Sequence, residues 1–275
     1  MDKILISGCS YTQHAEWPAY LWPNATITNM ASSGSSNQYI SDSIIQSIDL
    51  NNKPDSVFIL WTGLDKLDLV LPVSTLTTTL AKTHRFYRKI NNSYYFHDGG
   101  NKFHGNLTKC YKQIKDDSWP EVNDLIDFFA LTPAIRQECH NANILPISHY
   151  DQDDLEHYLQ ITFMLYRLYH KHDNKFFNDV SLSAIANCGT FLEHHKIPYR
   201  FSFCADVFSK HAAYSQGRID KTNPNFARIA WDKYIKLTPY EFGLKYDLMD
   251  SDDFHLTADG MKQWADQIRQ FLTKD

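Results

Sequence analysis

Two apolar runs limit most strongly what this 275-residue chain can fold into. Residues 3–7 read K-I-L-I-S and stop at Gly8, and residues 56–61 read S-V-F-I-L-W between Pro54 and Gly63. Short continuous runs of this kind are typical of strands that are covered on both faces. Isoleucines recur at helical spacing between the two runs, at Ile40, Ile44, Ile45 and Ile48. The order strand, helix, strand predicts a right-handed crossover and a parallel sheet.

The alternation of strands and helices continues further along the chain. Residues 25–30 and 199–203 predict two more strands, and residues 180–195 predict a helix. A last helix is predicted from an apolar stripe of four residues, Met261, Trp264, Ile268 and Phe271. We therefore predict an α/β fold of the flavodoxin-like kind, a three-layer sandwich with a central parallel sheet and helices on both faces.

Two long segments interrupt this rhythm. Residues from about 81–150 and from about 205–250 mix polar residues, glycine and proline with many aromatic residues and show little periodicity. Neither segment is bounded by a recognisable linker. We interpret residues 1–275 as one domain with two insertions.

Composition excludes several classes of function. The formal net charge is -5 and the basic residues are scattered, so we expect no nucleic-acid partner. No stretch approaches the roughly 18 apolar residues of a membrane helix, and no signal peptide precedes the first strand. The five cysteines lack a C-x-x-C pair, which disfavours disulfides and a zinc site. We expect a soluble cytoplasmic protein with no metal, no cofactor and no membrane partner, and its oligomeric state stays open.

Two distant segments carry residues that suit nucleophilic catalysis. Ser10 follows the first strand in G-C-S-Y-T, and Asp252 stands three residues before His255 in D-D-F-H. A serine becomes a nucleophile when a base takes its proton, and a carboxylate can orient the imidazole that does so. Taken alone, Ser10 and Asp252 also suit helix caps. The catalytic interpretation predicts a ring nitrogen of His255 within about 3.5 Å of Ser10 Oγ.

At this point the sequence resembles the SGNH (GDSL-like) hydrolase superfamily. G-C-S-Y-T at residues 8–12 is similar to the family's first block, G-D-S, whose serine is the nucleophile. N-M-A-S-S-G-S-S-N at residues 29–37 is similar to the second block, whose glycine N–H helps to bind the oxyanion. Gly34 occupies that position.

The later blocks follow in the family's order. Residues 59–65 end where the third block, G-x-N-D, stands in the family, and Asp252 and His255 match the D-x-x-H of the last block. The resemblance implies a triad of Ser10, Asp252 and His255. It also implies an oxyanion hole that includes Ser10 and Gly34.

The chain departs from the family pattern at two positions. Cys9 replaces the aspartate of the first block, a change that we expect to alter support of the turn more than the chemistry. Asp65 most nearly replaces the third-block asparagine, which donates a side-chain N–H to the oxyanion. An ionised carboxylate only accepts hydrogen bonds. Either Thr62, Asn37 or another loop residue therefore donates in place of Asp65, or the hole has only two donors.

We predict a serine esterase that forms an acyl-enzyme on Ser10. The resemblance implies a small acyl group on a carbohydrate or another polar alcohol, such as an O-acetyl sugar, and the aromatic-rich insertions suit a sugar. Two other interpretations stay open. One is a non-catalytic binding or structural module of the SGNH type, suggested by Asp65. The other is a flavodoxin-like nucleotide binder that uses the Ser-rich loop 32–36, although the chain lacks the usual glycine-rich phosphate motifs.

Asp65 provides a first test. We expect Asp65→Asn to restore a donor of the family type and to raise kcat by roughly tenfold or more, because one well-placed donor contributes about 2.7 to 4 kcal/mol. Steady-state kinetics on p-nitrophenyl acetate measure kcat. An unchanged kcat with a lower melting temperature would assign Asp65 to a structural pairing and leave Thr62 or Asn37 as the donor to test.

Overall fold

The structure is a computed structural model that describes residues 2–64, 66–72, 87–97, 174–209, 219–250 and 255–272. The chain forms two compact units. The first comprises Met1–Asp68 and His172–Asp275, and the second comprises Leu69–Lys171. The segment predicted as the first insertion falls in the second unit, mostly outside the described residues.

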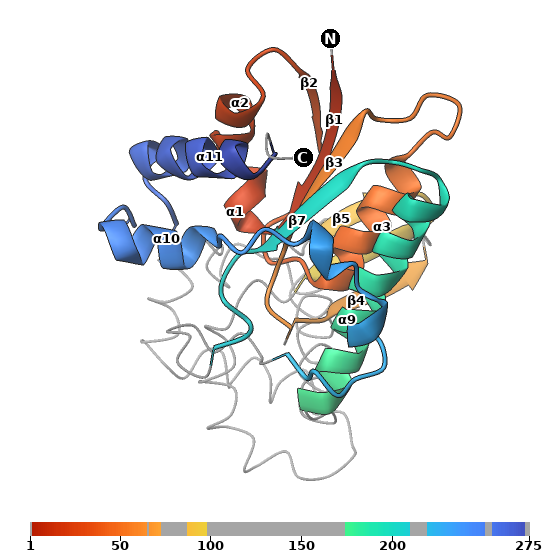
Figure 1. Cartoon of the computed structure of the whole chain (residues 1–275). Helices are drawn as coiled ribbons and strands as arrows, with labels where there is room; N and C mark the ends of the chain where they lie inside the picture. The colour runs from red at the N-terminus through yellow and green to blue at the C-terminus, as the bar shows by residue number, and fades with distance from the viewer. Residues whose placement is uncertain are drawn as a thin grey trace, which may run out of the picture. The chain divides into compact units, whose positions relative to one another are not determined.

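A four-stranded parallel sheet forms the centre of the first unit (Figure 1). Its strand order is β2-β1-β3-β7, and these strands are Thr26–Asn29, Lys3–Gly8, Ser56–Trp61 and Tyr199–Phe203. Gly8 pairs with Leu60 and Trp61 pairs with Phe203, so the carboxyl ends of β1, β3 and β7 meet at one edge. The predicted α/β fold with a central parallel sheet is confirmed.

Helices cover both faces of this sheet because side chains alternate along each strand. Ile4 and Ile6 of β1 join a core cluster with α2 (Trp17–Leu21) and α11 (Ala258–Leu272). Ser7 points to the opposite face, where its hydroxyl lies 2.7 Å from that of Ser43 in α3 (Asn37–Ser47). Figure 1 shows α2 and α11 on one side of the sheet and α3 with α9 on the other.

The helix α9 (Asn174–His194) begins earlier than the start predicted at residue 180. Apolar residues along its length are buried, among them Leu182, Ile185, Cys188 and Leu192, and the helix packs against α3. None of the helices in the described ranges is both long and apolar enough to cross a membrane.

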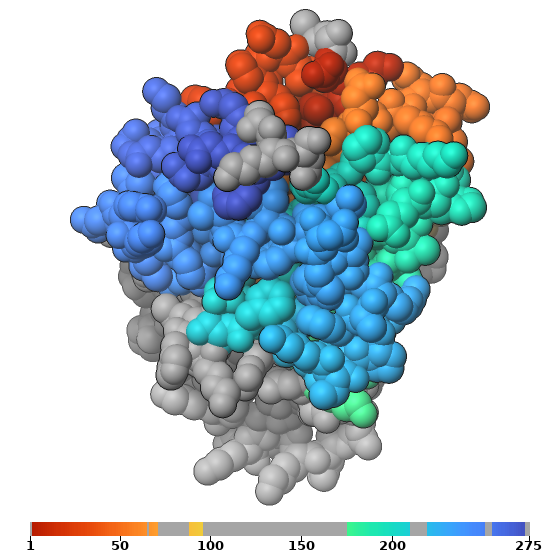
Figure 2. Space-filling model, viewed as in Figure 1, coloured from red at the N-terminus to blue at the C-terminus, as the bar shows by residue number. Residues whose placement is uncertain are grey.

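Three aromatic rings join the two ends of the chain. The ring centroid of Trp17 lies 5.2 Å from that of Trp264 and 5.4 Å from that of Phe58, both in edge-to-face geometry. Edge-to-face pairs at this spacing stabilise a core beyond the area that they bury. Figure 2 shows the surfaces of the early residues, in red, and of the last helix, in dark blue, side by side.

The predicted inner stripe of the last helix is wrong at one position. Phe271 is 42% exposed, whereas Leu272 packs against the core cluster. The inner face follows steps of four residues from Trp264 through Ile268 to Leu272, and residues four apart lie on one face of a helix. Phe271 therefore points away from the sheet.

The described part of the segment 205–250 contributes side chains to the core of the first unit. It contains two short 3₁₀ helices, η2 (Phe226–Arg228) and η3 (Trp231–Lys233), and then α10 (Pro239–Tyr246). The backbone N–H of Ile235 donates to the carbonyl of Phe201 in β7, at 2.8 Å. Ile235, Tyr240 and Phe242 are buried in the core cluster. This segment therefore contributes packing as well as covering the sheet.

The second unit contains a small sheet in the order β4-β6-β5. β4 spans Asp68–Pro72, β5 spans Tyr87–Ile90 and β6 spans Ser93–His97. β5 and β6 form an antiparallel hairpin with a two-residue turn, where Asn91 adopts a φ of 50°. Asparagine tolerates this left-handed conformation better than most residues.

The aromatic contact between the chain ends gives a stability prediction. We expect Trp264→Ala to lower the free energy of unfolding by about 3–5 kcal/mol, because it empties a fully buried site. Phe271→Ala on the same helix should cost less than about 1 kcal/mol, because that ring is exposed. Urea unfolding followed by tryptophan fluorescence and circular dichroism measures both values. Equal losses in the two variants would contradict this description of the core.

Candidate active site

Ser10 and His255 lie together although 245 positions separate them in the sequence. The distance between His255 Nε2 and Ser10 Oγ is 2.8 Å, which is a hydrogen bond. Either atom can donate, depending on the tautomer of the imidazole. The contact predicted from the sequence, within about 3.5 Å, is therefore present.

Ser10 is held by a sharp turn at the carboxyl end of β1. It is the first residue of α1 (Ser10–Gln13), a single helical turn, and Cys9 before it has an extended backbone. The N–H groups of Thr12 and Gln13 donate to the carbonyl of Cys9 at 2.9 and 3.1 Å. Ser10 therefore begins a helix directly above the edge where the parallel strands end.

His255 is held by a short backbone pairing just before α11. Met249 and Leu256 form an antiparallel bridge, and the N–H of Asp250 donates to the carbonyl of His255 at 2.7 Å. The N–H of Thr257 donates to the carbonyl of Leu248 at 2.9 Å. The neighbour of His255, Leu256, is buried in the core cluster. The pairing of residues 248–250 with residues 255–257 and the burial of Leu256 therefore fix the backbone of His255.

The loop that contains Gly34 is bonded to the turn that holds Ser10. The side-chain amide of Asn29 donates to the carbonyl of Thr12 at 3.0 Å, and the N–H of Ser33 donates to Gln13 Oε1 at 2.5 Å. Gly34 has a φ of 77°, a left-handed conformation that favours glycine. These bonds place the second block of the resemblance beside the first.

Asn37 and Thr62, two of the oxyanion donors considered from the sequence, bond to each other. The N–H of Thr62 donates to Asn37 Oδ1 at 2.9 Å. Asn37 Nδ2 donates to the carbonyls of Thr62 and Gly63 at 3.4 and 3.2 Å. Both side chains are fully buried. In this arrangement the amide of Asn37 connects α3 to the loop that leaves β3.

A second connection between these loops was not anticipated from the sequence. The carboxylate of Asp68 accepts a hydrogen bond of 2.6 Å from the hydroxyl of Ser36. It also accepts from the backbone N–H of Ser36. The same hydroxyl accepts from the N–H of Gln38 and caps α3. The sequence signal was the helix-capping serine, but its acidic partner is 32 positions away and follows no local pattern.

Cys9 is buried beside Ser10, and it is 2% exposed. The hydrogen bond with Cys204 lowers the pKa of the Cys9 thiol and raises that of Cys204, with burial opposing ionisation of both. Lys66 favours the thiolate form of both groups through its positive charge. Sequence reasoning missed Cys204 because it follows a different strand, β7.

The aromatic ring of Tyr11 lies against the imidazole of His255. The two ring centroids are 4.4 Å apart and the ring planes are inclined by 38°. Tyr11 follows Ser10 in the chain, so one helical turn provides both a hydrogen bond and a ring contact to the imidazole.

Two predicted site residues lie outside the described residues. Asp252 falls between Asp250 and His255, and Asp65 falls between Leu64 and Lys66. The roles of these two carboxylates stay predictions. Within the ranges that the structure describes, no group of three or more His, Cys, Asp and Glu side chains could hold a metal ion.

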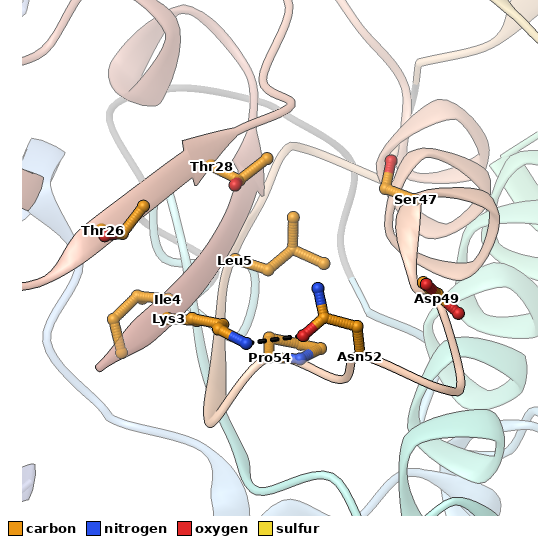
Figure 3. Close-up of a pocket in the computed structure, with 9 residues that line it drawn as sticks. All are labelled: Lys3, Ile4, Leu5, Thr26, Thr28, Ser47, Asp49, Asn52 and Pro54. Atoms are coloured by element: carbon orange, nitrogen blue, oxygen red, sulfur yellow. Dashed lines mark hydrogen bonds between the residues drawn. The ribbon is translucent and has the colours of Figure 1, made fainter. Parts of the chain in front are cut away.

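A pocket of about 340 Å³ lies at the opposite end of the strands from Ser10 (Figure 3). Residues at the amino ends of β1 and β2 and after α3 line it, and Lys3 Nζ there donates to Asn52 Oδ1 at 2.6 Å. None of the predicted site residues lines this pocket. It therefore plays no part in the arrangement around Ser10.

Comparison with known proteins adds no relative. No protein-family model matches the chain, and no curated protein matches it significantly. The interpretation of the site therefore depends on its residues and geometry.

Gly260 gives a test of how His255 is held. A Cβ added at Gly260 would lie 2.8 Å from the carbonyl oxygen of Leu248, a backbone atom of the pairing beside His255. We expect Gly260→Ala to lower the free energy of unfolding by about 1–3 kcal/mol, because overpacking must displace this backbone.

Gly189→Ala is the matched control for this test. Its Cβ would meet only the side chain of Tyr199, at 2.9 Å from the hydroxyl oxygen, which can move aside. Alanine also favours the helix over glycine by up to about 1 kcal/mol, so this variant should be neutral or more stable. Urea unfolding measures both variants. If Gly260→Ala were as stable as Gly189→Ala, the close packing of α11 on residue 248 would not be what fixes His255.

Proposed function

We propose that this chain is a serine esterase of the SGNH type that forms an acyl-enzyme on Ser10. The observation that supports this proposal most directly is the 2.8 Å contact between His255 Nε2 and Ser10 Oγ. Neither residue needs the other for the packing of its own segment, since Ser10 is held by the turn after β1 and His255 by its pairing before α11. A base in contact with a serine hydroxyl is what nucleophilic catalysis requires.

The first half of the reaction transfers the acyl group to Ser10. The hydroxyl proton passes to His255 Nε2 as Ser10 Oγ attacks the carbonyl carbon of the ester, which gives a tetrahedral oxyanion. The intermediate collapses, the bond to the alcohol oxygen breaks, and His255 donates its proton to that oxygen. The alcohol leaves, and the acyl group remains on Ser10.

The second half releases the acid. His255 takes a proton from a water molecule as the water oxygen attacks the acyl carbon. The second tetrahedral intermediate collapses, the bond to Ser10 Oγ breaks, and His255 returns the proton to the serine. The carboxylic acid leaves and the enzyme is restored. By resemblance, Asp252 would orient the imidazole through both halves.

The backbone N–H groups of Ser10 and Gly34 are the oxyanion donors that we propose. As the first residue of α1, Ser10 has an N–H group without an acceptor inside that helix. Gly34 lies in the loop after β2. Hydrogen bonds from Asn29 to Thr12 and from Ser33 to Gln13 join this loop to α1. Asn37 and Thr62 are weaker candidates, because the side-chain amide of Asn37 and the backbone N–H of Thr62 donate to protein acceptors. Removing one such donor typically lowers the rate by about a hundred to a thousandfold.

The substrate that we propose is an ester of a small acyl group, such as acetate, with a carbohydrate or another polar alcohol. The resemblance to SGNH esterases supports this class, and aromatic residues, 14% of the chain, would suit stacking on a sugar. No metal or cofactor enters the proposed reaction.

Covalent labelling separates this enzyme from a non-catalytic module of the same fold. We expect a fluorophosphonate to modify Ser10, and Ser10→Ala and His255→Ala each to lower turnover of p-nitrophenyl acetate by at least about a thousandfold. The double variant should be little worse than either single variant, because triad members act as a unit. Mass spectrometry of the labelled peptide identifies the modified residue.

Ser47→Ala is the matched control, because Ser47 lies at the end of α3 and lines the remote pocket. It should retain both labelling and turnover. A wild-type protein that is folded but neither labels at Ser10 nor turns over the ester would show that the chain is a binding or structural module.

A further inference from the structure

We propose that Tyr11 is a positioning residue that holds the imidazole of His255 in line with Ser10 Oγ. This inference rests on the proposed function, because it assigns Tyr11 a role in the same reaction. The observation that carries it is the ring contact, with centroids 4.4 Å apart and planes inclined by 38°. Aromatic pairs at this spacing attract each other in offset or tilted arrangements.

The hydrogen bond to Ser10 does not by itself fix the imidazole. A bond at Nε2 holds one corner of the ring, and contacts elsewhere on the imidazole add to its hold. The ring of Tyr11 opposes rotation of the imidazole, because such a rotation would break the ring contact. Ser10 and Tyr11 therefore hold the same ring through two different contacts.

Tyr11 is itself rigidly supported. Its backbone carbonyl accepts a hydrogen bond of 2.8 Å from Trp17 Nε1. Trp17 is 1% exposed and lies between the rings of Phe58 and Trp264. The side chain of Tyr11 packs against the core cluster that contains these rings. A rigid support is what a group needs if it is to hold another residue within a fraction of an ångström.

The contact also favours the charged state that the reaction creates. His255 becomes an imidazolium when it takes the proton of Ser10. An aromatic ring attracts a cation that lies over it within about 6 Å of its centre, and the centroid of the imidazole is 4.4 Å from that of Tyr11. This attraction is stronger in the transition state than in the resting enzyme, so it accelerates the chemical step more than it assists binding of the ester.

Three variants separate the ring of Tyr11 from its hydroxyl and from its packing. We expect Tyr11→Leu to lower kcat and the rate of fluorophosphonate labelling by roughly tenfold or more, with little change in KM, because small errors in placement slow such reactions strongly. Tyr11→Phe keeps the ring and should stay within about twofold of the wild type. Tyr20→Leu makes the same change at another tyrosine that packs against the core cluster and should also stay within about twofold.

Nuclear magnetic resonance supplies a measurement that does not depend on activity. The ring current of Tyr11 should shift the ring protons of His255 upfield, and the signals are assigned by their loss in His255→Ala. Tyr11→Phe should keep the shift, and Tyr11→Leu should remove it. Wild-type His255 signals at unshifted positions would overturn the inference even if Tyr11→Leu failed to fold.

The outcomes distinguish this inference from the proposed function. Labelling of Ser10 that is equally fast in Tyr11→Leu and the wild type would refute the role of Tyr11 and leave the esterase proposal intact. An equal loss in Tyr11→Phe and Tyr11→Leu would also refute it, since the hydroxyl would then matter and the ring contact would not. Absence of any labelling or turnover in the wild type would refute both proposals.

Discussion

The packing of Trp264 against Trp17 is the interaction on which the candidate site depends. It places the last helix, α11, beside α2, which follows Ser10 by a few residues. Two residues separate His255 from α11, so the contact that joins the two helices also brings the segment of the imidazole beside that of the serine. The indole N–H of Trp17 donates to Tyr11, and the aromatic core therefore reaches the site through a single hydrogen bond. The core and the candidate site are therefore in direct contact.

The strands and the pair Ser10 and His255 could be predicted because their signals are local. The apolar runs at residues 3–7 and 56–61 match β1 and β3, since a strand covered on both faces needs no partner information to be recognised. Ser10 was found from its position after a strand and His255 from its block before a helix. Their mutual distance followed from the resemblance, because no periodicity encodes a contact across 245 positions.

The details that could not be predicted are set by tertiary contacts. Phe271 fits an apolar stripe in sequence, but Leu272 takes the inner position because the helix continues in steps of four from Trp264. The segment 205–250 lacks periodicity, yet Ile235 bonds to β7 and its neighbours fill the core. Asp68 accepts a hydrogen bond from Ser36, the residue that caps α3, although 32 positions separate the two residues. For Ile235 and Asp68 the deciding partner is far away in the chain.

Cys9 stands where the SGNH pattern that residues 8–12 resemble has an aspartate, and the structure shows how the turn around Ser10 is supported without one. Cys9 is buried with Cys204 in the aromatic core, where a carboxylate would lose its hydration. A thiol costs little to bury, and its polar contacts here include another thiol, the backbone of Tyr11 and the hydroxyl of Thr62. The turn is supported instead by the bonds of Asn29 to Thr12 and of Ser33 to Gln13. The carbonyl of Cys9 also accepts from Thr12 and Gln13, and none of these bonds needs a carboxylate, so the placement of Ser10 does not require an acidic side chain at position 9.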